Sequence, residues 1–106
     1  MQQISATQLK QLIDSSEPTP LLLDVREPHE YEICHIDGSL LMPMQSVPNR
    51  LDELDSKQCI ITICHHGMRS QQVAQFLFNN GFGNVINLSG GVNAWANEVD
   101  IDMPCY

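Results

Sequence analysis

Residues 60–70 of this chain are IITICHHGMRS. The β-branched run 60–63 is typical of a buried strand, and residues 71–80 have the apolar spacing of a helix. A short loop joins them, beginning at Cys64 and ending near Ser70, which can cap the helix. In an open α/β sheet, ligands bind at such a junction, outside the carboxyl end of a strand. The stretch therefore indicates a strand–loop–helix junction with a candidate site in the loop.

The remaining sequence alternates in the same way between strand and helix patterns. Ser5 and Gln8 form a capping box for a first helix that ends near Asp14. Further helices are expected over 28–33, over 46–54 with Ser46 as the cap, and from 91 onward. Strands are expected over 21–25, 39–42, 59–63 and 85–88. This alternation predicts an α/β fold, with a four- to five-stranded, mostly parallel sheet and helices on both faces.

Length and charge limit the function classes. The 106 residues suit one domain, 1–106, with an irregular tail from about residue 100. The net charge of −8 disfavours nucleic acid and anionic membranes as partners. A small anionic substrate stays possible where the local field is positive. No apolar run approaches the roughly 20 residues of a membrane span, and the first residues lack a secretory signal, so we expect a cytoplasmic protein.

The cysteine pattern argues against covalent or metal cross-links. The four cysteines are Cys34, Cys59, Cys64 and Cys105, and no pair has C-x-x-C spacing. In the reducing compartment expected for this chain, disulfides are rare. The spacing also disfavours a zinc site, so we expect no metal. Cys59, inside a strand-like run, is interpreted as a small core residue.

Cys64 is the candidate nucleophile. A buried structural cysteine is the alternative, but two histidines and a glycine follow it, and they continue a buried strand poorly. A turn there places the sulfur at the base of a concave loop whose N–H groups point inward. Those N–H groups, the start of the following helix and Arg69 all favour the thiolate.

The other loop residues have less specific roles. Gly67 allows the backbone conformation of a tight cradle. Arg69 can pair with a nearby acid or bind a substrate anion, and the sequence leaves both open. His65 and His66 are expected to be exposed, and either can contact substrate or acceptor. Met68 is expected at the rim or inner wall of the pocket.

The spacing between Cys64 and Arg69 narrows the substrate. Four residues intervene, which gives C-x4-R. Cysteine phosphatases combine a cysteine, an anion-cradling loop and an arginine as C-x5-R. One residue fewer makes a narrower cradle, which suits a single sulfur better than a tetrahedral phosphate.

Three stretches of the sequence together resemble a known family. They are residues 23–31, LDVREPHEY, with 35–38, HIDG; the loop at 64–70; and residues 88–95, LSGGVNAW. In this order they resemble the first signature, the active-site loop and the C-terminal signature of the single-domain rhodaneses, and the resemblance covers almost the whole chain. The sequence departs from the family where Cys34 stands, a position commonly occupied by glycine. If that position needs positive φ, Cys34 would be strained there; it is also a candidate second thiol near the site.

The resemblance implies a thiosulfate-type sulfurtransferase. Cys64 would take a sulfane sulfur from thiosulfate or a similar small anionic donor and carry it as a persulfide. The loop from His65 to Arg69 would stabilise its charge. Cyanide, a thiol or a partner protein would then accept the sulfur, without a cofactor. Asp24, Arg26 and Glu30 are interpreted as a polar network that supports the loop together with Ser70.

Two other function classes stay open from the sequence. One is a cysteine phosphatase or arsenate reductase on a related fold, which the C-x4-R spacing disfavours. The other is a non-catalytic rhodanese-like binding module, which the presence of Cys64 disfavours.

Overall fold

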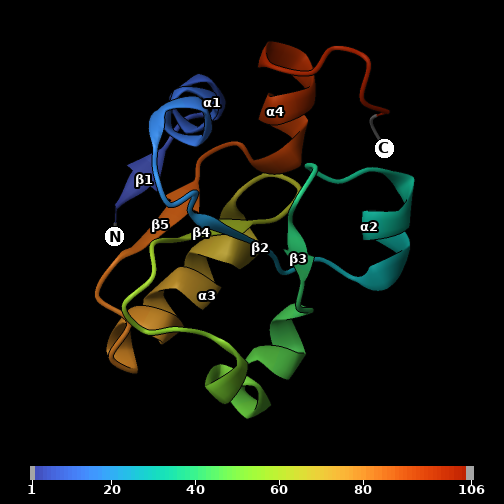
Figure 1. Cartoon of the computed structure of the whole chain (residues 1–106). Coiled ribbons are helices and arrows are strands. Elements are labelled where there is room, and N and C mark those ends of the chain that lie inside the picture. Colours follow the sequence, from blue (N-terminus) through green and yellow to red (C-terminus); the bar gives the residue numbers. More distant parts are fainter. Residues whose placement is uncertain (1, 105–106) are drawn as a thin grey trace.

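A computed structural model describes residues 2–104, and its five strands form one parallel sheet (Figure 1). The strands are β1 (Gln3–Ile4), β2 (Leu21–Asp24), β3 (Leu40–Leu41), β4 (Ile60–Ile63) and β5 (Val85–Leu88). Their order across the sheet is β1-β5-β4-β2-β3, and each neighbouring pair is parallel. The α/β class with a parallel sheet is therefore confirmed, and the carboxyl ends of all strands lie at one edge.

Helices cover both faces of this sheet. The α-helices are α1 (Ala6–Ser15), α2 (Pro28–Ile33), α3 (Met68–Asn79) and α4 (Gly91–Glu98). Figure 1 shows α1 and α4 on one side of the sheet and α3 on the other. The predicted capping box at the start of α1 is present, because the Ser5 hydroxyl and the Gln8 side chain each accept the other residue's backbone N–H.

Strand β4 separates the two halves of the core. Ile61 and Ile63 pack with α1 and α4, whereas Ile60 and Cys64 pack with α3. This alternation is the two-residue period of a strand with both faces buried. It also places the sulfur of Cys64 on the α3 side of the sheet.

The segment after β3 differs from its prediction. The apolar spacing predicts an α-helix over residues 46–54, but the chain forms two 3₁₀ helices, η1 (Met44–Asn49) and η2 (Leu51–Glu53). Pro48 lies inside η1 and has no N–H for an α-helical hydrogen bond. The same spacing predicts burial correctly, since Val47 and Leu54 are both in the core.

The described chain begins with a short strand and ends in irregular backbone. The sequence pattern did not predict β1, which is only two residues long and pairs with β5. After Glu98 the chain continues as turns and irregular backbone to Pro104.

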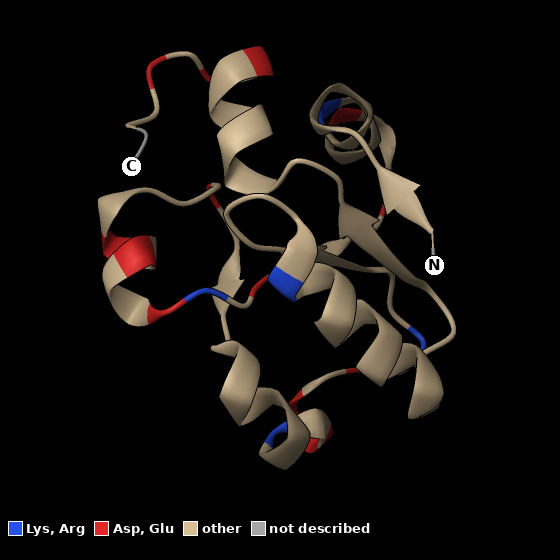
Figure 2. Cartoon of the chain, turned by 180° about the vertical axis from the view of Figure 1, so that it is seen from behind, with Lys and Arg blue, Asp and Glu red and all other residues tan. Residues whose placement is uncertain are grey.

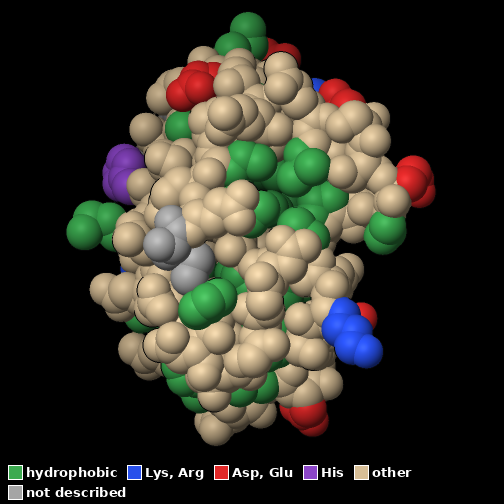
Figure 3. Space-filling view, turned by 90° about the vertical axis from the view of Figure 1, so that its left-hand side faces the viewer, with side chains coloured by type: hydrophobic (Ala, Val, Ile, Leu, Met, Phe, Trp, Pro, Cys, Tyr) green, Lys and Arg blue, Asp and Glu red, His purple; other side chains and the backbone are tan. Residues whose placement is uncertain are grey.

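Within residues 2–104, every helix is too short or too polar to span a bilayer. Figure 3 shows acidic side chains scattered over the face with β1, beside a hollow where hydrophobic side chains gather.

Candidate active site

Cys64 follows β4 directly and lies at the base of a tight loop. Its side chain has no exposed surface. The N–H of Gly67 donates a hydrogen bond to its Sγ over 3.0 Å, and the Ser70 hydroxyl lies 3.3 Å from the same atom. The loop thus turns back on its own sulfur, and a backbone N–H and a hydroxyl from the start of α3 lie against it.

The start of α3 corrects the predicted role of Ser70. The helix begins at Met68, and its N-cap is Gly67, with φ of +103°, rather than Ser70. A left-handed glycine lets the chain enter the helix earlier than the side-chain pattern suggests. Ser70 is therefore inside the first turn, fully buried, and its hydroxyl faces Cys64 instead of capping the backbone.

The first turn of α4 donates two backbone hydrogen bonds to the active-site loop. The N–H of Val92 donates to the Cys64 carbonyl over 2.9 Å, and that of Asn93 donates to the His65 carbonyl over 3.0 Å. Gly91 makes this approach possible, because a Cβ there would lie 2.3 Å from the Cys64 carbonyl oxygen. The orientation of the peptide groups after Cys64 and His65 is therefore set by a second helix.

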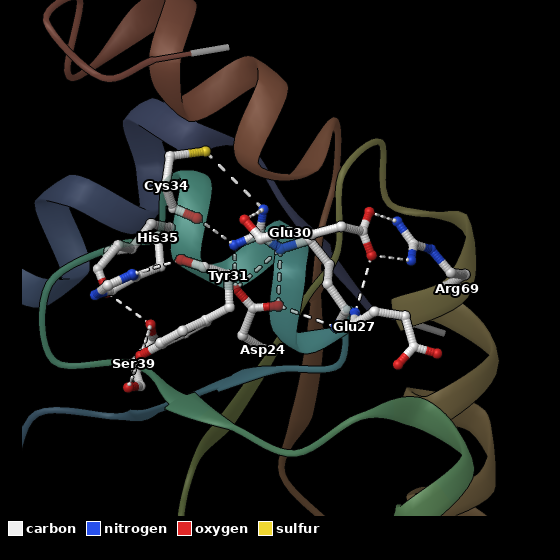
Figure 4. Close-up of polar contacts among 10 residues, drawn as sticks. Asp24, Glu27, Glu30, Tyr31, Cys34, His35, Ser39 and Arg69 are labelled. Carbon is white, nitrogen blue, oxygen red and sulfur yellow. Dashed lines mark hydrogen bonds and ion pairs between the residues drawn. The ribbon is translucent and has the colours of Figure 1, made fainter. Parts of the chain in front are cut away.

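A buried ion pair lies beside the loop (Figure 4). Arg26 and Asp24 are both unexposed, and the Arg26 guanidinium makes three contacts of 2.7–3.1 Å to the Asp24 carboxylate. Arg26 also donates to the carbonyls of Cys34, over 2.7 Å, and Glu30, over 3.4 Å. Breaking such a pair by removing one partner leaves a buried charge without compensation. The pair therefore ties the end of β2 to α2.

Glu30 extends this network to the active-site loop. Its carboxylate accepts two hydrogen bonds from the Arg69 guanidinium, over 2.8 and 2.9 Å, and one from the Glu27 N–H over 2.9 Å. Figure 4 shows Arg69 and Glu30 facing one another, and Figure 2 shows the positively charged segment at the start of α3 among few other cationic positions on the ribbon. The sequence left two roles open for Arg69, pairing with an acid or binding a substrate anion. In the structure Arg69 pairs with an acid, Glu30. A substrate anion would compete with Glu30 for the same N–H groups.

The remaining loop side chains differ in exposure. His66 is exposed, as expected, whereas His65 is half-buried. Burial lowers the pKa of His65, and the nearby His66 and Arg26 lower it further, so its neutral form is favoured at neutral pH. Met68 is 76% exposed, which places it at the rim and not in the inner wall.

Cys34 adopts ordinary extended backbone, so the strain anticipated at this position is absent. Its φ is −163° and its ψ is 151°. Its Sγ is buried and lies 4.0 Å from Nη1 of Arg26. Cys34, Cys59 and Cys64 are free thiols, and Cys105 lies outside the described residues. Over residues 2–104, no three His, Cys, Asp or Glu side chains gather as a metal site requires.

Asn87 is a residue that the sequence interpretation did not single out. It lies in β5, is 1% exposed, and has hydrogen bonds to the side chains of Gln3, Thr62 and Ser70 and to the Gly67 carbonyl. Its sequence signal is an amide inside the otherwise apolar strand Val85–Leu88. An amide in that environment costs free energy unless it is hydrogen-bonded.

A family model described as the rhodanese-like domain matches residues 5–98. The chain belongs to the rhodanese-like domain family. This assignment confirms the resemblance drawn from the three signature stretches, and the active-site loop, both supporting helices and the Asp24–Arg26 pair all lie inside the matched residues.

Relatives of this rhodanese-like chain include proteins of similar and of greater length. It is 35% identical over 92 residues to the thiosulfate sulfurtransferase GlpE of Pseudoalteromonas translucida, covering 87% of this chain and 86% of that protein. It is 34% identical over 110 residues to the adenylyltransferase and sulfurtransferase MOCS3-2 of Zea mays, covering 97% of this chain and 23% of that protein. The chain thus spans about a quarter to about half of the length of several curated relatives.

Solved structures show the same fold. A rhodanese-like domain protein from Staphylococcus aureus is 30% identical and superposes with a TM-score of 0.85, covering 93% of this chain and 95% of that one. The rhodanese-like architecture is therefore shared over nearly the full chain.

Proposed function

We propose that this rhodanese-like chain is a sulfurtransferase that carries a sulfane sulfur on Cys64. In the first half-reaction, the Cys64 thiolate attacks the outer sulfur of thiosulfate or a similar anionic donor. A new S–S bond forms on Cys64, the S–S bond of the donor breaks, and sulfite leaves with the bonding electron pair. Because Cys64 has no exposed surface, the donor reaches the sulfur only when the loop side chains part.

The second half-reaction returns the thiolate. An acceptor, either cyanide or a thiol on a small molecule or a protein, attacks the terminal sulfur of the Cys64 persulfide. The bond between the two sulfurs breaks, and Cys64 leaves as the thiolate. The pathway is a double displacement, so ping-pong kinetics are expected. Each step uses only Cys64 and the two substrates.

The hydrogen bond from the Gly67 N–H to Sγ of Cys64, at 3.0 Å, carries this proposal. It directs a backbone donor at the atom where negative charge resides, next to the N-terminal end of α3. Relatives of matching length that are named as sulfurtransferases support the same chemistry. We also propose that the side chains of the loop contact the substrate; these are His65, His66, Met68 and Arg69.

A phosphatase is less well supported by the site. Phosphate chemistry on such a loop uses the arginine to bind the equatorial oxygens bidentately. Here the Arg69 guanidinium is already in a bidentate pair with Glu30, which is 8% exposed. Arg69 would have to leave that pair to bind a tetrahedral anion.

Steady-state kinetics test the proposal. With thiosulfate and cyanide, wild-type protein is expected to form thiocyanate and sulfite with parallel double-reciprocal lines. Cys64→Ser is expected to be inactive, and Cys59→Ser, a matched change at the half-buried thiol, to stay active. Hydrolysis of an aryl phosphate without thiocyanate formation would favour the phosphatase. Absence of both activities would favour the binding module.

A further inference from the structure

A polar row crosses three strands beneath the active-site loop. Asn87 of β5 is in register with Gln3 of β1 on one side and with Thr62 of β4 on the other. Thr62 and Asn87 are buried on the α3 face, between the apolar neighbours of each strand. Buried polar groups of this kind are retained only where their hydrogen bonds are made. The row reaches Cys64 through Ser70.

Hydrogen bonding fixes which way the Asn87 amide points. One of its terminal atoms faces the Gly67 carbonyl over 3.0 Å, and a carbonyl only accepts, so that atom is the nitrogen. Nδ2 also donates to the Gln3 side chain over 2.8 Å. Oδ1 therefore faces the hydroxyls of Ser70, at 2.5 Å, and Thr62, at 3.2 Å. Because Oδ1 only accepts, both hydroxyls donate to it.

Ser70 thus has two competing uses for a single proton. While its O–H donates to Asn87, only oxygen lone pairs face Sγ of Cys64, which suits a thiol that donates its S–H. A thiolate has no proton to give and needs the Ser70 proton itself. When Ser70 turns toward the sulfur, Thr62 still donates to Oδ1 and keeps the buried amide oxygen satisfied.

We propose that Asn87 and Thr62 are positioning residues that set how readily Ser70 donates its proton to Cys64. Asn87 withholds the proton while Cys64 is a thiol, and Thr62 compensates Asn87 when the proton moves to the sulfur anion. The inference concerns the charge state of the Cys64 sulfur. It rests on the proposed function only where it links that charge state to sulfur transfer.

Thr62 is the better position for a test. Replacing Asn87 would remove both the acceptor for Ser70 and the donor to Gly67, and these losses act in opposite directions on the thiolate. Thr62→Val removes one hydroxyl at nearly constant volume, on a residue that does not touch the sulfur. Asn87 Oδ1 then depends on Ser70 alone, so the proton is held away from Cys64.

The charged and titratable groups around the loop stay unchanged in this test. They are His65 and His66 on the loop, Arg69 on α3, Glu30 on α2, and the Arg26–Asp24 pair after β2.

The experiment measures the rate of Cys64 alkylation by iodoacetamide across pH, by peptide mapping. For Thr62→Val we expect alkylation at neutral pH to be about threefold to tenfold slower, the scale of one weakened hydrogen bond to a charged atom. At a pH high enough to ionise any cysteine thiol, the rates should converge with wild type. Thr62→Ser, which keeps the hydroxyl, should restore the wild-type profile, and Ile61→Val controls for a changed β4 core.

A double-mutant cycle decides the mechanism. In a Ser70→Ala background, Thr62→Val should no longer move the pH profile, because no proton is left to redirect. An unchanged profile for Thr62→Val, or an equal shift with and without Ser70, would overturn the inference. Alkylation requires no sulfur donor. Failure to form a persulfide with thiosulfate would therefore count against the proposed function and leave this result standing.

Discussion

Gly91→Ala is the sharpest test of how the active-site loop is held. The new Cβ would lie 2.3 Å from the Cys64 carbonyl oxygen and 2.5 Å from that of His65. Reaching an ordinary contact of 3.4 Å requires the first carbonyl to retreat by about 1 Å. That movement would break the hydrogen bonds from α4 to the loop, which are 2.9 and 3.0 Å long.

The expected cost follows from these contacts. Left-handed backbone at a non-glycine residue costs about 1–2 kcal/mol. Each buried carbonyl or N–H left unpaired adds about 1–3 kcal/mol. We therefore expect Gly91→Ala to lose at least about 3 kcal/mol of unfolding free energy. Gly81→Ala is the matched control, because Gly81 also has positive φ, +91°, but a Cβ at that position would have no neighbouring atom within 4 Å.

Two measurements separate the clash from the backbone strain. Urea denaturation should show a loss of only about 1–2 kcal/mol for Gly81→Ala. The single-turnover rate with thiosulfate should fall on the order of a hundredfold for Gly91→Ala, the effect of a 1 Å misplacement, and stay near wild type for Gly81→Ala. Equal losses of stability and rate in the two variants would refute the argument that α4 positions the loop.

Three further outcomes follow from the structure. Arg26→Met should lower the unfolding free energy by about 3–5 kcal/mol, because Asp24 then stays buried without its partner. Urea denaturation measures this loss. A loss below about 1 kcal/mol, on the scale of an exposed ion pair, would show that the pair is not buried in solution. Burial raises the pKa of the Cys59 thiol, and no hydrogen bond from residues 2–104 is described at its sulfur, whereas the buried Cys64 sulfur accepts one from the Gly67 N–H, which favours a thiolate. Iodoacetamide should therefore label Cys64 before the more exposed Cys59; the reverse order in peptide mapping would show that exposure alone decides. The pKa of His65 is lowered, so its NMR titration should have a midpoint below the ordinary 6.5, and a midpoint above that value would contradict its half-buried position.

The sequence predicted the elements whose pattern is long or chemically distinctive. The run before Cys64 predicted β4, and the alternation of strand and helix patterns predicted a parallel sheet. The structure adds that β2 pairs with β4, which brings the first signature beside the loop. The proposed network of Asp24, Arg26 and Glu30 has its contacts in the structure, and it reaches the loop through Arg69. Charged residues at a strand end indicate such contacts because buried charges require partners.

Other features depend on geometry that the side-chain pattern does not contain. The early start of α3 depends on the dihedral angles of Gly67, and Ser70 looked like a cap for that reason. The 3₁₀ geometry around Pro48 depends on hydrogen bonds that an apolar stripe leaves undefined. Asn87 and Thr62 did carry a signal, since each is a polar residue inside an apolar strand. Recognising their pairing required the register between β4 and β5.

Intact-mass spectrometry after incubation with thiosulfate tests the central claim most directly. The account predicts that the protein gains the mass of one sulfur atom, that cyanide or a reducing thiol removes it, and that Cys64→Ser never gains it. Wild-type protein whose mass stays unchanged, or a Cys64→Ser variant that gains the same sulfur, would contradict the assignment of Cys64 as the sulfur carrier.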